Sequence, residues 1–509
     1  MIKTASQYHQ HTSYERGKIA GHYLDWRNQP DVYKEYPGIT PVLLPENTPS
    51  LMGKLSSVLK DADTDDSVRT MGIKDLSLIL LLTCSITAKA RYSGEDIYYR
   101  SPASAGALYP TEIYVATQGV EGLDDELYHF EVHRHSLSPL RKADLSGYVA
   151  GLTIPHLKTA PTITFFFTAI FFRSAWKYRD RSYRYHLLDT GHVIENLVLA
   201  MKALGLPLNL SYDFDDSRTD HLLGLDESKE VSLAMAHVPG ADPISVSKGQ
   251  DIDELSGDIR KRSIVSGSEV DYPAIGEIHR EGKAVVSQEK CGPDILNSLG
   301  VTTETWRGMP DTSFWPGQID YSECIFKRRS SRNFVKKPMI KEAFFTLLDL
   351  LCLNNRNDLK SCSVYGESLC AGFFAGDIES LVPGLYILDN VRRRFGLVTS
   401  GPFMDSVARV CLDQSWLGNA AVHFLFLSNL DLLDRTWGAR GYRYAMLNAG
   451  RMGERIYIGA TSMGLGCCGI GAFYDGEAAE LIGLNKDSRL LYLVAVGPIK
   501  SFPKRSIVD

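Results

Sequence analysis

The stretch Arg181-Ser-Tyr-Arg-Tyr185 recurs as Arg440-Gly-Tyr-Arg-Tyr444, at a distance of 259 residues (440 minus 181). Held without gaps, the same offset aligns further identical residues downstream of the motif. The aligned pairs are Leu188 with Leu447, Gly191 with Gly450, Glu195 with Glu454, Gly205-Leu206 with Gly464-Leu465, Phe214 with Phe473, Asp216 with Asp475, and Gly224-Leu225 with Gly483-Leu484. A register kept over so many positions predicts that the chain contains two diverged copies of one unit.

Both copies show the same order of predicted elements. An early helix (74–85, 341–353) precedes several strands, which in the first copy lie over 112–117, 127–132 and 162–172. A long helix follows (183–204, 442–463) and ends at a glycine, Gly205 or Gly464, as helices commonly do. A last strand (231–237, 490–496) closes each unit. The pattern predicts an α+β fold in which two similar domains are fused as an intramolecular pseudo-dimer.

The length of 509 residues also favours two domains, because one hydrophobic core rarely serves so long a chain. We predict an N-terminal extension over 1–54, a first domain over 55–245, a connector over 246–317 and a second domain over 318–509. The connector is rich in turn formers and charges, which predicts a segment draped over the domains.

Composition excludes several classes of function. The net charge is −6 without a basic stripe, which argues against nucleic acid as a partner. The longest apolar run, 162–172, is too short to cross a bilayer, so we expect no membrane span. Nine scattered cysteines, an odd number without a C-x-x-C pair, predict reduced thiols in a cytoplasmic protein rather than disulfides or a metal site.

Arg328-Arg-Ser-Ser-Arg332 opens the second copy, immediately before its first helix. Arginine offers forked donors and serine adds short ones, so Arg328, Arg329, Ser330 and Arg332 suit a phosphate. The alternative is a solvated basic patch.

Gly464-Leu-Gly-Cys-Cys-Gly-Ile-Gly-Ala-Phe473 follows the second long helix. Its glycines let the backbone approach a flat ligand, which makes Leu465, Gly466, Gly469, Ile470 and Gly471 candidate binding residues. The alternative is a glycine-rich turn between a helix and a strand.

Arg100-Ser-Pro-Ala-Ser-Ala-Gly-Ala-Leu-Tyr-Pro-Thr-Glu112 lies in the first copy. Small residues between two prolines favour a rigid loop that a ligand can approach closely. The candidate binding residues here are Pro102, Ala103, Ser104, Ala105 and Gly106.

Taken together, these motifs and Lys177-Tyr178 resemble the nitroreductase family, and within it the SagB-type dehydrogenases that form thiazoles and oxazoles in peptides. Asp25-Trp-Arg-Asn-Gln-Pro30 and Tyr8-His9 resemble the leader of long members of that branch. The resemblance implies FMN as cofactor, bound between two subunits. It places the R-R-S-x-R loop and the glycine-rich segment on one subunit and the P-S-A-G-type loop on the other.

The two copies have kept complementary motifs. Alignment of the early helices places residues 328–332 opposite the acidic 61–65, which would repel a phosphate, and residues 205–214 lack the inner glycines. In the second copy, 370–376 stand roughly opposite the loop 104–110, and Thr436-Trp437 replace Lys177-Tyr178. We therefore predict one composite FMN site per chain and a second site that is dead. The alternative is that both sites have decayed.

The resemblance gives Lys177 and Tyr178 the catalytic role, in which they remove a proton while FMN takes a hydride. A lysine acts as a base only when burial or a neighbouring cation lowers its pKa. The alternative is a surface cation beside a packing aromatic. Arg184 and Arg443 recur in both copies, so we interpret them as structural pairs at the domain interface, and His192 as a core or interface histidine.

The sequence thus predicts an FMN-dependent dehydrogenase that oxidises a peptide, such as one with an azoline ring, or a small molecule. Two alternatives stay open: an NAD(P)H-dependent nitro or quinone reductase, and a non-catalytic partner in a peptide-modifying complex. Fusion removes the need for a second subunit, so a monomer is expected to suffice, although further self-association is compatible with the sequence.

Overall fold

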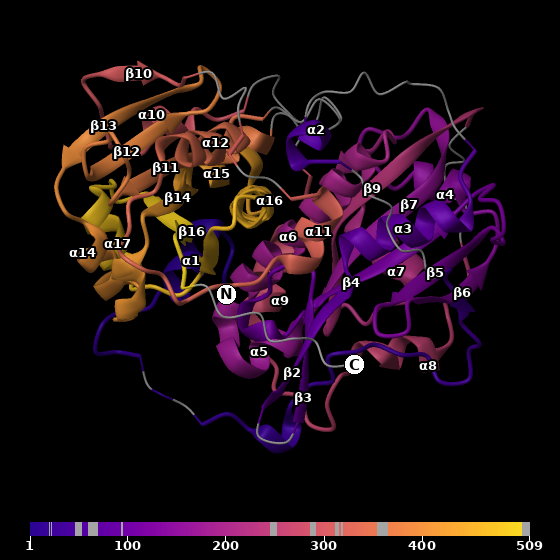
Figure 1. Cartoon of the computed structure of the whole chain (residues 1–509). Coiled ribbons are helices and arrows are strands. Elements are labelled where there is room, and N and C mark those ends of the chain that lie inside the picture. Colours follow the sequence, from indigo (N-terminus) through magenta and orange to yellow (C-terminus); the bar gives the residue numbers. More distant parts are fainter. Residues whose placement is uncertain are drawn as a thin grey trace.

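The computed structural model describes residues 1–19, 21, 23–45, 53–59, 70–92, 95–244, 252–285, 292–310, 315–316, 319–353 and 365–500. Two bodies, each built on one large sheet, lie side by side, and two long helices run between them (Figure 1). The first copy forms the purple body and the second copy forms the orange-to-yellow body. The predicted α+β fold of two fused, similar units is confirmed.

The two sheets have the same topology. The first has the order β1-β6-β5-β4-β7-β9-β8 and the second the order β10-β13-β12-β11-β14-β16-β15, and all neighbours within them are antiparallel. The strands of the first sheet are β1 (Val42–Leu43), β4 (Thr111–Thr117), β5 (Glu126–Glu131), β6 (Ser136–Lys142), β7 (Thr159–Ile170), β8 (Asn209–Ser211) and β9 (Glu230–Pro243). Those of the second are β10 (Trp306–Gly308), β11 (Cys370–Ala375), β12 (Gly384–Asp389), β13 (Arg394–Ser400), β14 (Val422–Asn429), β15 (Gly466–Ile470) and β16 (Ser488–Gly497).

The helices that flank the sheets also come in pairs. The pairs are α3 (Ile73–Thr83) with α12 (Lys341–Leu351), α5 (Phe171–Tyr178) with α15 (Leu430–Trp437), α6 (Ser182–Ala203) with α16 (Arg440–Ser462), and α7 (Asp216–Leu223) with α17 (Asp475–Ile482). Helices α5 and α15, like α7 and α17, begin and end 259 residues apart, the offset of the sequence repeat. The strand predicted over 162–172 ends at Ile170, because Phe171 and Phe172 already belong to α5.

Each sheet takes an edge strand from outside its predicted domain. Strand β1 of the extension pairs with β6, and β10 of the connector pairs with β13. The extension also contains α1 (Ala5–His11), and the connector contains α8 (Gly257–Arg260), α9 (Pro273–Glu281) and α10 (Ile295–Ser298). The remaining helices and strands are α2 (Leu55–Leu59), β2 (Ile86–Tyr92), β3 (Glu95–Arg100), α4 (Ser146–Ala150), α11 (Tyr321–Lys327) and α14 (Met404–Val410).

Two properties of the whole chain bear on its class. Among the helices of the described residues, none is long and apolar enough to cross a membrane. The seven cysteines in the described part of the chain are all buried, and none forms a disulfide.

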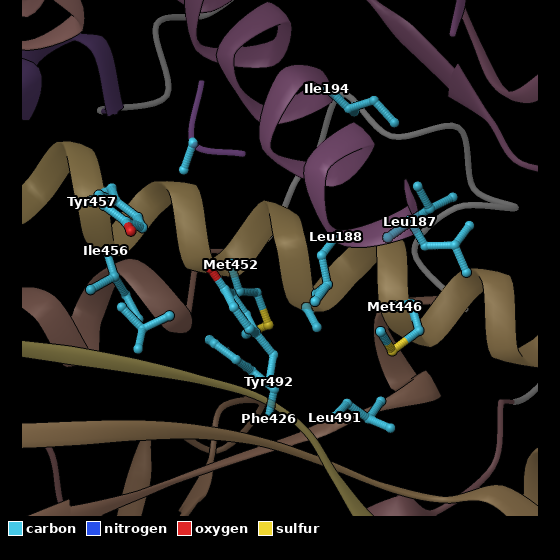
Figure 2. Close-up of a cluster of buried hydrophobic side chains, with 14 of the residues drawn as sticks. Leu187, Leu188, Ile194, Phe426, Met446, Met452, Ile456, Tyr457, Leu491 and Tyr492 are labelled. Carbon is cyan, nitrogen blue, oxygen red and sulfur yellow. The ribbon is translucent and has the colours of Figure 1, made fainter. Parts of the chain in front are cut away.

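Helices α6 and α16 join the two halves. Figure 2 shows α16 lying between α6 and the strands of the second sheet, with Leu188 of α6, Met452 of α16 and Tyr492 of β16 in one apolar layer. The two helix backbones touch at Gly191 and Gly450. A Cβ atom on Gly191 would lie 2.3 Å from the carbonyl oxygen of Leu447, so only glycine permits this crossing.

Gly191→Ala is therefore expected to destabilise the chain by about 1–3 kcal/mol, the usual cost of overpacking a core. Gly276→Ala in α9 is the matched control, because no atom lies within 4 Å of its added Cβ. Urea unfolding of both variants checks this, and equal unfolding midpoints for Gly191→Ala and the control would contradict the close crossing.

Candidate functional site

The predicted catalytic pair lies at the C-terminal end of α5, against the loop that follows β3. Within this loop η2 (Ala105–Ala107) contains Gly106, whose φ is +67°. A Cβ on Gly106 would lie 2.8 Å from the Tyr178 hydroxyl and 3.2 Å from Lys177 Nζ. The structure thus brings both catalytic candidates onto the predicted close-approach loop, and the absence of a side chain at Gly106 makes room for them.

Asp189 of α6 anchors this loop, a role that the sequence analysis missed. Ser104 Oγ donates to Asp189 Oδ2 at 2.6 Å, and the Ala105 amide donates to the same carboxylate at 3.2 Å. Pro102 and Ala103 are buried just before these contacts. Burial raises the pKa of Asp189 to about 7, although both hydrogen bonds favour the charged form.

The second domain supplies the other wall. Residues 328–332 follow α11 and run beside β15, where the Ser331 amide donates to the Cys467 carbonyl at 2.8 Å. Tyr457 of α16 ties the two segments together, because its hydroxyl shares a 2.9 Å hydrogen bond with Ser330 Oγ and accepts one of 2.6 Å from the Gly469 amide.

Two of the predicted phosphate ligands, Arg328 and Arg329, form hydrogen bonds to backbone carbonyls of the first domain. Arg328 is buried and donates to the carbonyls of Ser101 and Arg100, and Arg329 donates to the carbonyl of Thr87 at 2.6 Å. Arg328 still has one buried nitrogen, Nη1, that finds no hydrogen-bond partner among the described residues.

The third arginine faces the catalytic pair across the domain boundary. Burial and the nearby Arg332 both lower the pKa of Lys177 below its ordinary value of 10.5. Among the described residues, neither Lys177 nor Arg332 forms an ion pair with a carboxylate. The Arg332 guanidinium lies 5.8 Å from the centre of the Trp416 ring. Two cations that approach one another without a counter-ion make a place for an anion.

The glycine-rich segment has a packing role. A Cβ on Gly466 would lie 2.1 Å from Ile499, one on Gly469 would lie 1.7 Å from the Tyr492 hydroxyl, and one on Gly471 would lie 2.6 Å from Tyr185. These glycines therefore make room for side chains of the protein itself. Leu465 and Ile470 pack beside them, and Ile470 is buried.

Aromatic side chains from two other segments lie near Tyr178, and the sequence analysis did not identify them. The Tyr178 and Tyr185 ring centres are 4.5 Å apart, and Tyr185 Oη donates to the Gly471 carbonyl at 3.3 Å. Tyr14 of the extension stacks under the Arg181 guanidinium at 4.2 Å. The repeated Y-R-Y motif was the signal for Tyr185, whereas nothing in the sequence pointed to Tyr14.

The repeated arginines form two ion-pair clusters related by the pseudo-twofold symmetry. Asp475 accepts from Arg181 at 2.7 Å and from Arg184 at 2.6 Å. At the equivalent place Asp216 accepts from Arg440 and Arg443, both at 2.5 Å. Each cluster joins the two domains, so the interpretation of Arg184 and Arg443 as structural interface residues is confirmed.

His192 is also an interface residue. Its Nδ1 lies 2.5 Å from the Glu454 carboxylate of the other domain, and its Nε2 lies 3.0 Å from the Tyr492 hydroxyl. No group of three or more potential metal ligands occurs among the residues that the structure describes.

Aromatic rings fill the position that the pseudo-symmetry makes equivalent to this site. Tyr212 stands 259 residues before Gly471, and Tyr444 the same distance after Tyr185. Tyr365 packs against both, with its ring centre 4.2 Å from that of Tyr444 and 5.7 Å from that of Tyr212. The hydroxyls of Tyr365 and Tyr444 both donate to the buried Asp213 carboxylate.

One predicted correspondence is wrong. Residues 370–376 do not form a loop opposite 104–110, because Cys370–Ala375 is strand β11, which occupies the place of β4 in the second sheet. The counterpart of η2 is η5 (Gly366–Ser368). Approximate alignment failed here because the two copies differ in loop length. The acidic residues 61–65 lie outside the described residues.

The paired sheets, the helix crossing between them and the interdomain site define a fused nitroreductase-type protein. The chain belongs to the nitroreductase family, whose sequence model matches residues 55–238 and 390–498, which are 184 and 109 residues or 293 of 509.

Individual relatives are more distant. The chain is 24% identical over 177 residues to MJ1384 of Methanocaldococcus jannaschii, named as a nitroreductase, a match that covers 34% of this chain and 89% of that one. It is 31% identical over 169 residues to the trifolitoxin-processing protein TfxB of Rhizobium leguminosarum bv. trifolii. That match covers 31% of this chain and 45% of TfxB, so the chain spans about half the length of this relative.

A crystal structure of an Anabaena variabilis protein, also named as a nitroreductase, superimposes with a TM-score of 0.77 at 24% sequence identity. The superposition covers 98% of this chain and 100% of the Anabaena chain. The whole arrangement, with both domains and their extensions, is therefore a fold that an experimental structure also shows.

Proposed function

We propose that the chain is an FMN-dependent oxidoreductase with one composite flavin site, formed between a first domain at 55–245 and a second at 318–509. The observation that carries the proposal is the proximity of Arg332 and Lys177, which come from opposite domains and neither of which forms an ion pair with a carboxylate among the described residues. The unpartnered Nη1 of Arg328 adds a buried donor, and Ser330 adds a hydroxyl. Arg332, Arg328 and Ser330 fit the anionic part of FMN, which requires cations and short donors, whereas Lys177 would serve the substrate.

Bound FMN would accept a hydride from the substrate, which is chemistry that belongs to the cofactor. The protein would hold and orient it with the loop 102–106, the loop 328–332 and the segment 465–471. Lys177, whose pKa is lowered by burial and by Arg332, would in its deprotonated form take the substrate proton on Nζ, and Tyr178 beside it would orient the reacting group.

We further propose that the substrate is a peptide, in particular one that carries an azoline ring to be oxidised. TfxB is named for the processing of trifolitoxin, and the motif order resembles SagB-type dehydrogenases. Such an enzyme would act with the other proteins of a peptide-modifying complex. Because both halves of the site belong to one chain, no second copy is needed to complete it.

The second position is proposed to bind no flavin. The rings of Tyr212, Tyr365 and Tyr444 occupy its interior, and Asn448 Nδ2 donates to the Tyr365 carbonyl at 2.7 Å, which holds that ring in place. Opening a cavity for an isoalloxazine ring there would remove several fully buried aromatic side chains from the core.

Purified protein reconstituted with FMN is expected to retain one FMN per chain. Arg332→Gln is expected to weaken FMN binding by about 10- to 100-fold, since a hydrogen bond to a charged group contributes about 1.5–3 kcal/mol. Flavin absorbance and fluorescence titration measure both quantities. Arg435→Gln is the control, because this side chain is 73% exposed.

Two bound FMN per chain would refute the single site, and unchanged affinity in Arg332→Gln would refute the role of Arg332. Protein that takes up no FMN would indicate the non-catalytic partner instead. If the protein rapidly oxidises NADPH with a nitroaromatic acceptor and does not oxidise a thiazoline peptide, the function is that of the reductase.

A further inference from the structure

The turn that carries Gly106 has a backbone conformation that needs external support. Gly106, Ala107 and Tyr109 have φ values of +67°, +55° and +46°. Residues with a side chain rarely adopt this left-handed region, and two of the three positions are not glycine. Strained backbone of this kind persists only where neighbouring groups hold it, and it is concentrated at functional sites.

Asp189 supplies that support. Its carboxylate accepts from Ser104 Oγ and from the Ala105 amide, and Ser104 Oγ in turn accepts from the Tyr109 amide at 2.9 Å. Both ends of the strained turn are thereby tied to α6. A carboxylate has two acceptor oxygens for these two donors, whereas an asparagine amide offers only one.

The second half of the chain provides an internal comparison. Asn448 stands 259 residues after Asp189 and contacts the equivalent turn, where its Nδ2 lies 2.7 Å from the Tyr365 carbonyl and 3.3 Å from Ser368 Oγ. None of the described residues 365–369 has a positive φ. The strained turn and Asp189 thus occur together on the side of Lys177, whereas the filled position has Asn448 and no positive φ among the described residues of its turn.

An aspartate occupies position 189 although burial disfavours its ionised form. Asp189 is 5% exposed and forms no ion pair among the described residues. Burial raises its pKa from 3.8 to about 7. The tyrosines near it are Tyr178 and Tyr492, and burial raises the pKa of both above 10, so neither provides a counter-charge. Asparagine at the equivalent position shows that a neutral residue fits this helix crossing.

We propose that Asp189 is a positioning residue that holds the strained turn 104–109 against Lys177 and Tyr178. The turn then presents Gly106 to the catalytic pair in one fixed conformation. The catalytic meaning of this contact rests on the proposed function, whereas the hold of Asp189 on the turn does not.

Amide hydrogen exchange of the flavin-free protein tests the hold directly. Asp189→Asn is expected to speed exchange at Ala105 by about 10-fold or more, because a hydrogen bond to a charged acceptor is lost. Asn448→Ala is the matched control at the equivalent place and should leave exchange at Ala105 unchanged. Unchanged exchange in Asp189→Asn would overturn the proposal.

Global stability separates positioning from simple structural support. The pKa of Asp189 is higher in the folded protein than in the unfolded chain. The free energy of unfolding therefore falls as pH rises from 3.8 towards 7, because the carboxyl ionises more readily in the unfolded chain. Asp189→Asn is therefore expected to unfold at an equal or higher urea concentration than wild type at pH 8. A lower midpoint would show that Asp189 only supports the fold.

Activity is read in the same variants. Asp189→Asn should keep bound FMN and lose at least 10-fold in the oxidation of a thiazoline peptide, whereas the control Asn448→Ala should retain most of this activity. If wild type binds no FMN, the proposed function fails while the exchange experiment still decides the role of Asp189. Full activity in Asp189→Asn with faster exchange would overturn the positioning role.

Discussion

Replacing Lys177 with methionine is expected to slow the oxidation of a thiazoline peptide by about 10²- to 10⁴-fold, the contribution typical of a positioned acid–base group. Methionine keeps the apolar stem that packs near Gly106 but removes Nζ, which would lie 3.2 Å from a Cβ there. Bound FMN and its chemical reduction by dithionite should be retained, because Lys177 is not needed for the flavin to accept electrons. Single-turnover flavin absorbance measures the rate.

The matched control is Lys142→Met, a lysine that is 76% exposed on the surface of the first domain. A rate within twofold of wild type for Lys177→Met, with flavin retained, would mean that Lys177 is a packing cation and that the proton leaves by another route.

The pH profile gives an independent test of the same residue. A base must be deprotonated, so the rate should rise with pH and level off above the pKa of Lys177, which burial and Arg332 place below 10.5. Removing the neighbouring charge in Arg332→Gln makes the protonated lysine less unfavourable, so its pKa rises and the profile should move to higher pH. A profile that does not move would exclude Lys177 as the titrating base.

Replacing Asp475 with alanine is expected to destabilise the chain by about 3–5 kcal/mol, because it leaves buried cations without a partner. Asp475 binds Arg181 and Arg184, lies 3.1 Å from His9 Nε2 and accepts the Tyr14 amide at 2.8 Å. One carboxylate thus joins the second domain, the first domain and the extension. Urea unfolding at pH 7 measures the loss, and Asp431→Ala is the control, because the Asp431 side chain is 40% exposed and pairs with the exposed Arg435.

The same carboxylate predicts acid sensitivity. Although burial alone would raise it, Arg181 and Arg184 hold the pKa of Asp475 well below 3.8. A depressed pKa contributes stability above the unfolded value that is lost as pH falls through the folded one, so the difference between wild type and Asp475→Ala should persist to pH 4 and shrink below it. Equal unfolding midpoints at pH 7 would contradict this account.

The fold could be predicted from the sequence because the two copies keep a constant offset of 259 residues. Helices are long enough to keep their 3.6-residue pattern and their glycine ends, so α6 and α16 were predicted to within two residues at each end. The pair Lys177-Tyr178, the loop 102–106 and the residues 328–332 were also identified by local motifs, and the structure brings all three together.

What the sequence could not reveal are contacts made by the folded chain at long range. Asp189 and Tyr457 sit inside regular helices, where no pattern distinguishes a ligand of a loop from an ordinary buried polar residue. Tyr365 lies after a segment whose length differs between the copies, which shifted the predicted counterpart of η2 into strand β11. Tyr14 reaches the site from the extension, for which the repeat has no equivalent.

One of the two equivalent positions carries Lys177-Tyr178 and the other is filled by aromatic rings, which has a consequence for how such a protein can change. A symmetric homodimer must accept every substitution twice, once at each of its two identical centres. In this chain the two equivalent positions are encoded separately, so each can be substituted alone. Tyr212 and Asn448 could therefore arise at one position without any change of their counterparts, Gly471 and Asp189. Tyr365 could likewise pack there without affecting the other position. Under the proposed function, fusion would thereby let one of two equivalent centres become packed interior and leave the other free to specialise.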